Sequence, residues 1–134
     1  MRHSIFAALL LPSLCLGDYL RDVKPLLTKH CTKCHGGEKQ RGGLRLDTAE
    51  HALKGGNSGS VILPKNSSKS RLLLAIQGGN DDIRAMPPRG EKLTKQQIAL
   101  IAKWIDDGAV APKNEIAQES KKSDHWAFQS IQRH

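Results

Sequence analysis

Two cysteines three positions apart, Cys31 and Cys34, are followed directly by His35. This spacing is the attachment signature of c-type haem, because one tight turn offers both thiols to the two vinyl groups of a porphyrin while the adjacent imidazole reaches the iron. The cysteine pair alone would also fit a zinc site or a thiol redox motif. The adjacent histidine favours haem, so we predict that Cys31 and Cys34 form thioethers and that His35 is the proximal iron ligand.

Met86 is the only methionine after the initiator, and Pro87 and Pro88 stiffen the chain behind it. We predict that its sulfur is the distal iron ligand, because a neutral, soft thioether favours ferrous iron and raises the reduction potential. The alternative is that Met86 fills the core. His51 and His125 are other possible sixth ligands, but neither stretch indicates convergence on the motif, and His30 is too close to it to cross to the other haem face.

The chain resembles the planctomycete-type cytochrome c domain, a small monohaem class found at the front of large exported proteins. The resemblance covers about Asp18 to Pro112 and rests on residues 23–27, 31–36, 43–47, 54–59 and 86–88. It implies an all-α fold of the class I cytochrome c type, with three to four helices around one covalent haem and a Gly-rich loop insertion. It also implies that the chain is the N-terminal part of a larger exported protein.

The first 17 residues have a basic start, an apolar run from Ile5 to Leu16, and small residues at Cys15 and Gly17. This pattern predicts a secretory signal peptide and export to the periplasm, the cell envelope or the medium. The run is too short for a stable membrane span, although an uncleaved anchor stays an alternative. Cleavage would leave only Cys31 and Cys34, and we prefer thioethers to a disulfide because a disulfide there would close a very small loop.

The remaining chain is small for a self-sufficient apolar core, and aromatic residues make up only 4% of the sequence. A haem would fill that core. We predict a cytochrome c domain at 18–112, followed at 113–134 by a polar linker or tail. The stretch from His125 to Phe128 indicates a further domain beyond this chain, or else a disordered tail with chance aromatics.

Helix signals occur at several places within 18–112. A helix should lead into Cys31, starting at Asp18 with a kink at Pro25 or starting at Asp22 with Pro25 in its first turn. Later segments predict a helical turn at 47–53, a helix at 70–77 capped by Ser67 or Ser68 and ended by Gly78, and a helix at 95–107 with a capping box of Thr94 and Gln97.

Two further expectations concern packing. We expect Trp104 to pack against the first helix. Gly36, Gly37, Gly42 and Gly43 should let the backbone pass close to a flat ligand, with Leu44 and Leu46 covering a haem edge, although a flexible surface loop is the alternative.

The chain carries a formal charge of +8, and much of the excess lies around the cysteine motif. The cluster comprises Lys29, Lys33, Lys39, Arg41 and Arg45. It is either a docking patch for an acidic redox partner or a solvated face. No nucleic-acid-binding motif accompanies the charge, so we do not expect nucleic acid as a partner.

These features together predict one-electron transfer by a haem with both axial positions filled. The chain would then be an electron carrier for a partner protein or a fused downstream domain, more than a catalyst on its own. A first alternative is a haem enzyme or redox sensor with an open or displaceable distal site. A second is an exported interaction module without haem, in which Cys31, Cys34 and two of His30, His35 and His51 hold zinc.

Overall fold

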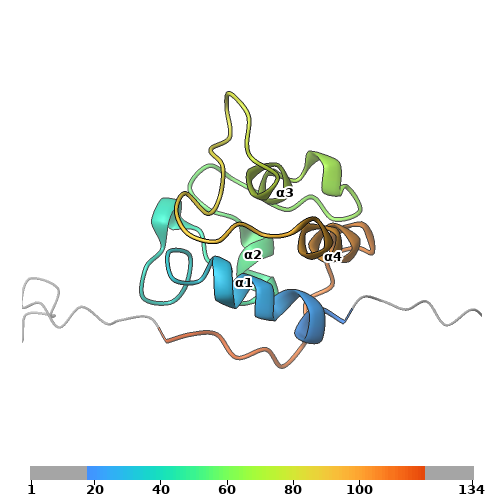
Figure 1. Cartoon of the computed structure of the whole chain (residues 1–134). Coiled ribbons are helices and arrows are strands. Elements are labelled where there is room, and N and C mark those ends of the chain that lie inside the picture. Colours follow the sequence, from blue (N-terminus) through green and yellow to red (C-terminus); the bar gives the residue numbers. More distant parts are fainter. Residues whose placement is uncertain (1–17, 120–134) are drawn as a thin grey trace, which may run out of the picture.

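The computed structural model describes residues 18–119, which form four α-helices and no β-strand. The helices are α1 (Lys24–His30), α2 (Ala49–Lys54), α3 (Arg71–Ile76) and α4 (Lys95–Asp106), connected by long loops (Figure 1). Single helical turns occur at Tyr19–Val23, Arg41–Gly43 and Ser67–Lys69. The all-α prediction is confirmed for this part of the chain. None of these helices is long and apolar enough to cross a bilayer.

The segment leading into the cysteine motif combines the two predicted starts. The Asp18 carboxylate caps the chain by accepting from the Arg21 amide at 3.3 Å, and the first turn, Tyr19–Val23, is π-helical. Pro25 then lies in the first turn of α1, where an amide hydrogen would have no partner within the helix. The helix therefore accommodates Pro25 without an interior break and delivers the chain directly into Cys31.

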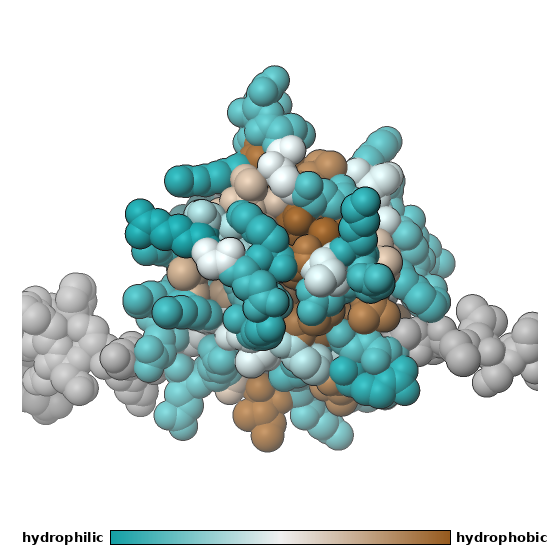
Figure 2. All heavy atoms as spheres, in the orientation of Figure 1, coloured by the Kyte–Doolittle hydropathy of each residue, from teal (hydrophilic) through white to brown (hydrophobic). Residues whose placement is uncertain are grey.

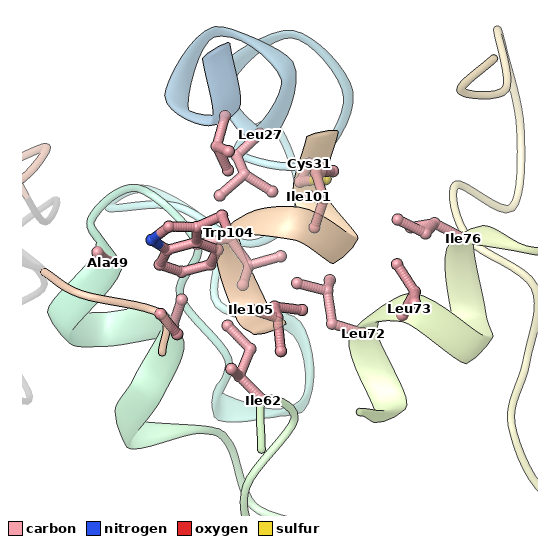
Figure 3. Packing of buried hydrophobic residues seen from close by; sticks show 14 of the residues in the cluster. Leu27, Cys31, Ala49, Ile62, Leu72, Leu73, Ile76, Ile101, Trp104 and Ile105 are labelled. Carbon is pink, nitrogen blue, oxygen red and sulfur yellow. The ribbon is translucent and has the colours of Figure 1, made fainter. Parts of the chain in front are cut away.

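Helix α4 forms the centre of the core, as its strong sequence signals predicted. Thr94 and Gln97 make the reciprocal capping box, and the helix ends one residue earlier than expected, at Asp106. Its buried face contains Trp104 and packs with residues from α1, α2 and α3 (Figure 3). The Trp104 ring lies 4.9 Å from the ring of Tyr19, in the turn before α1. The predicted packing of Trp104 against the first helix is confirmed.

The predicted N-terminal cap of α3 is wrong. Ser67 lies in a separate helical turn that Asn66 caps, and the residue at the N-cap position of α3 is Ser70. Ser70 is completely buried, and its hydroxyl accepts from the Leu63 amide at 2.9 Å and donates to the Asn66 carbonyl oxygen at 2.8 Å. The hydroxyl thus satisfies buried loop backbone instead of the helix end. At the other end Gly78 directly follows the C-cap Gln77 with a positive φ of 126°, and the amides of Gly78 and Gly79 donate to the carbonyl oxygens of Ala75 and Leu74, so the predicted glycine stop is present.

The chain after α4 runs alongside α1 in Figure 1, where it is drawn in orange. This segment was predicted to begin a linker at residue 113. The boundary at 112 stays a prediction, but residues up to 118 make hydrogen bonds and an ion pair with the domain. The predicted signal peptide at 1–17 and the rest of the tail, including His125, lie outside the described residues.

Candidate haem site

Cys31, Cys34, His35 and Met86 line the same cavity, which has a volume of about 370 Å³. Cavities that hold small molecules and cofactors are typically about 300–1,000 Å³. The sequence therefore predicted a set of residues that the fold brings together from two distant segments. The apolar lining includes Leu44, Leu46, Val61, Leu72, Ala75, Ile76 and Ile83.

The apolar face of α3 lines the cavity, and Leu44 and Leu46, which were expected to cover a haem edge, also border it. In Figure 2 hydrophobic residues come to the surface near α3, within a mostly hydrophilic surface. An apolar surface of this kind suits the flat, apolar body of a porphyrin.

A tight turn presents the two thiols. The Cys31 amide donates to the Leu27 carbonyl oxygen of α1 at 2.8 Å, so the turn continues the helix. The amides of Cys34 and His35 both donate to the Cys31 carbonyl oxygen, at 3.1 and 2.9 Å. Two cysteines and a histidine are therefore held within one turn, which is the local geometry that attachment to a single porphyrin requires.

The imidazole of His35 has no hydrogen-bond partner within residues 18–119, and its Nδ1 atom is buried. The backbone around the ring is fixed, because the His35 carbonyl oxygen accepts from the Leu46 amide at 2.7 Å. An iron-bound porphyrin fits this site, since Nε2 is free to bind the metal.

Met86 is partly buried and packs against the hydrophobic core. Its amide donates to the carbonyl oxygen of Ala75 in α3 at 2.9 Å. This bond ties the loop at 80–90 to α3, which itself lines the cavity. Met86 thus contributes to packing and also borders the cavity, and its ligation of iron stays a prediction.

Both cysteines are free thiols in the structure. Burial raises the pKa of the Cys31 thiol to about 11. Cysteines that exchange disulfides have lowered pKa values, because the thiolate is the nucleophile. The environment of Cys31 is therefore unlike that of a thiol redox motif.

The residues of the zinc alternative do not form a metal site within the described part of the chain. Within the part of the chain that the structure describes, no three His, Cys, Asp or Glu side chains gather in a way that could hold a metal ion. His51 instead has its Nδ1 atom 3.2 Å from the Asp47 carboxylate, and it does not line the cavity. His30 does line the cavity, with its Nδ1 atom 3.2 Å from the Glu91 carbonyl oxygen.

The glycines after the motif have a different role from the one predicted. A Cβ atom on Gly37 would overlap with the backbone of Gln118 and Glu119, and one on Gly36 with the Thr32 carbonyl oxygen and the Gln118 side chain, so this pair makes room for other parts of the chain and not for a flat ligand. Gly43 is close to Asn57 in the same way. Of the four glycines only Gly42 lines the cavity.

The C-terminal contacts were missed because the sequence after Pro112 is polar and has no periodicity. Gln118 contacts Gly37 behind the motif loop and Asp47 (side chain 0% exposed), and Glu115 contacts Lys24 and the Ala49 amide. Burial alone would raise the pKa of Asp47, but the Arg45 guanidinium and the Gln118 amide bind the carboxylate and lower its pKa to about 2. Gly36 and Gly37 were the one feature of the sequence to indicate that another segment packs closely behind the motif loop.

The predicted basic cluster divides in two. Arg45 binds Asp47 at 2.6 Å and faces the C-terminal segment, away from the cavity. The other part borders a second hollow of about 550 Å³ that also contains Cys34 and Pro87. Its exposed cations are Lys29, Lys33 and Arg41 from the predicted cluster, together with Arg84 and Arg89 from the methionine loop. Lys39 lines neither hollow.

A small all-α domain whose Cys-X-X-Cys-His turn and loop methionine share an apolar cavity has the features of a c-type cytochrome domain. Residues 31–90 match the family model for planctomycete cytochrome C, and this similarity supports a planctomycete-type cytochrome c domain in this part of the chain. The family is one of haem-based electron transfer with covalently bound haem, and such domains typically lie outside the cytoplasm. No curated protein and no solved structure matches the chain.

Proposed function

We propose that this protein is a one-electron carrier with a single haem c, bound through Cys31 and Cys34 and ligated by His35 and Met86. The observation that carries the proposal is the cavity of about 370 Å³ that these four residues border together. Bound haem supplies reversible exchange of one electron between ferric and ferrous iron. The remaining chemistry belongs to the chain's own side chains.

Each cysteine has a defined task in this proposal. Its thiol adds across a vinyl group, so that a carbon–sulfur bond forms and the thiol proton moves to the neighbouring vinyl carbon. His35 and Met86 then supply one imidazole and one thioether, both neutral. Neutral ligands in an apolar cavity disfavour the extra charge of ferric iron, and the resulting reduction potential is high. The apolar lining also limits the access of water.

The alternative with an open distal site has some support. Asp82 and Arg84 border the cavity, and peroxide chemistry needs polar groups of this kind. Both residues are exposed, however, and Met86 is tied to α3 by its backbone. We therefore favour the carrier.

The test is made on the haem-loaded full chain, produced together with a cytochrome c maturation system. The carrier should keep one haem per chain through denaturing electrophoresis, and its ferrous form should not bind carbon monoxide. Haem that is lost on acid–acetone extraction contradicts covalent attachment. Rapid carbon monoxide binding by the unchanged protein contradicts ligation by Met86 and favours the open-site alternative.

We also propose that an acidic redox partner docks at the hollow of about 550 Å³ beside Cys34. Its lining cations are exposed, and the only acid among its lining residues, Glu91, already pairs with Lys29 at 2.9 Å. Cys34, which would hold a vinyl group of the haem, borders the same hollow as these cations. Unneutralised cations beside the electron-transfer edge favour a negatively charged partner.

Two inorganic redox probes of opposite charge test the docking proposal. Changing Lys33, Arg84 and Arg89 to Gln should slow reduction of ferricyanide and flatten its dependence on ionic strength, while speeding reaction with a cationic cobalt phenanthroline complex. The matched control changes Lys54, Lys69 and Lys95 to Gln, which removes the same charge elsewhere. Equal effects of the two triple variants would show that only net charge matters.

The export and context of the domain are also proposed. The signal-like pattern at 1–17 and the usual location of cytochrome c domains support export. We propose that the domain serves as the front module of a longer protein. Mass spectrometry of the exported protein should find an N-terminus near Asp18, and the full reading frame should continue past His134. Retention in the cytoplasm would contradict the export proposal.

A further inference from the structure

We propose that residues 113–119, here named the clasp, are a positioning element of the haem site. The clasp lies outside the segment that matches the cytochrome family and does not line the haem cavity. It binds the rear of the loop that carries His35. The inference rests on the proposed function, because it concerns the proximal ligand of the haem.

The first anchor of the clasp is Glu115. Its side chain is only 4% exposed, and its carboxylate accepts from Lys24 Nζ at 2.6 Å and from the Ala49 amide at 2.7 Å. Lys24 begins α1 and Ala49 begins α2. One buried carboxylate therefore connects the first residues of two helices, and α1 leads directly into the cysteine motif.

The second anchor is Gln118, which makes three hydrogen bonds. Its amide donates to the Asp47 carboxylate at 2.8 Å, and its carbonyl oxygen accepts from the Arg45 guanidinium at 2.8 Å. Its side-chain oxygen accepts from the Gly37 amide at 3.2 Å. Gln118 thus joins the loop directly after His35 to the segment at 45–47.

The segment at 45–47 is itself bonded to the proximal histidine. Leu46 lies between the two residues that bind Gln118, and its amide donates to the His35 carbonyl oxygen at 2.7 Å. The clasp therefore reaches His35 by two short routes, through Gly37 and through Leu46. Because the ring of His35 has no hydrogen bond of its own, its position depends on this backbone.

The buried glycines Gly36 and Gly37 complete the contact. A Cβ atom on Gly37 would overlap with the backbone oxygens of Gln118 and Glu119. Gly37 does not have the positive φ that favours glycine, so close approach of the clasp is what requires glycine here. Gly37→Ala should displace the clasp from the loop side without changing any clasp residue.

Detaching the clasp should loosen the His35 loop and admit water behind it. Greater access of water favours the more highly charged ferric state, so the reduction potential should fall. The Leu46 amide should exchange its hydrogen faster, because its bond to His35 is no longer held from behind. A segment that only adds stability would leave the potential unchanged in the folded protein.

The experiment compares haem-loaded full chains carrying Gln118→Ala or Gly37→Ala with the unchanged protein. Both variants should show faster exchange at Leu46 and a lower reduction potential, although they alter opposite sides of the contact. Glu119→Gln is the matched control, since the Glu119 side chain belongs to the clasp but makes none of these bonds, and it should change neither quantity.

An unchanged potential in both variants, with exchange at Leu46 increased, would overturn the positioning role. Unchanged exchange would overturn the contact itself. Failure of the unchanged chain to hold covalent haem would instead refute the proposed function, so the two failures are distinguishable.

Discussion

The loop that carries Cys31, Cys34 and His35 has two unlike faces. The front face borders an apolar cavity, and the His35 ring that lines this cavity has no hydrogen-bond partner within residues 18–119. The rear face is polar and densely bonded, through Gly37, Leu46, the buried carboxylate of Asp47 and the clasp. The difference teaches that the chain's own hydrogen bonds hold the rear of the loop in place. The front of the loop contributes side chains to the cavity, where the proposed haem would contact them.

The largest expected effect lies on the front face. Changing Cys31 and Cys34 together to Ala should abolish covalent haem, because no thiol remains within reach of a vinyl group. Haem staining after denaturing electrophoresis measures this directly. Cys34→Ala alone, as the control, should retain haem through one thioether. Full staining of the double variant would show that the front face does not bind haem as proposed.

A second change on the front face removes the distal ligand. Met86→Ala should open the iron to carbon monoxide, lower the reduction potential, and abolish the weak long-wavelength charge-transfer band of ferric haem bound by a thioether. Ile83→Ala is the control, because Ile83 lines the cavity from the same loop but has no atom that could ligate iron. Persistence of the band in Met86→Ala would assign the sixth position to another residue.

The stability that the rear face contributes should decrease at acidic pH. The pKa of Asp47 is about 2 in the folded protein against an ordinary value of 3.8. A lowered pKa contributes stability above the unfolded value, and this stability is lost as the pH falls from near 3.8 to near 2. The loss should be about 2 kcal/mol, since one pKa unit corresponds to about 1.4 kcal/mol.

Urea unfolding of the haem-loaded protein across this pH range measures the loss. Asp47→Asn should lower stability by about 3 kcal/mol at neutral pH, because it removes the charged partner of the largely buried Arg45 guanidinium, and it should flatten the acid dependence. Asp81→Asn, at an exposed site, should do neither. An acid dependence that survives Asp47→Asn would assign it to other carboxylates.

The smallest expected effect comes from the edge of the rear network. His51 contacts Asp47 at 3.2 Å, but its side chain is 30% exposed. His51→Ala should therefore cost less than about 1 kcal/mol in unfolding free energy and leave the visible spectrum unchanged. A cost as large as that of Asp47→Asn would show that the polar face depends on all its members equally.

Several features could be predicted from the sequence because their causes are local. The turn at Cys31–His35 and the capping box at Thr94 and Gln97 involve residues at most four positions apart, and the buried stripe of α4 follows from helical periodicity. Met86 was selected because the chain has no other methionine after the first residue. These signals are contained in a few neighbouring residues.

The N-terminal cap of α3 and the role of the glycine pair could not be predicted in this way. Ser70 turns its hydroxyl toward loop backbone because it is buried, and burial is decided by the whole fold. A serine before an apolar run looks the same whether its hydroxyl caps a helix or satisfies a loop.

The amino-acid sequence by itself determined the chemistry that we propose for the front face, because the Cys-X-X-Cys-His motif is defined by residue types at a fixed spacing. Only the tertiary structure decided the rear face. Gly37 and Gln118 are 81 positions apart, and neither the glycine nor the glutamine carries a local mark of its partner. Hydrogen bonds at that separation depend on where α1, α2 and α4 place the chain, and so they appear only once the helices have packed.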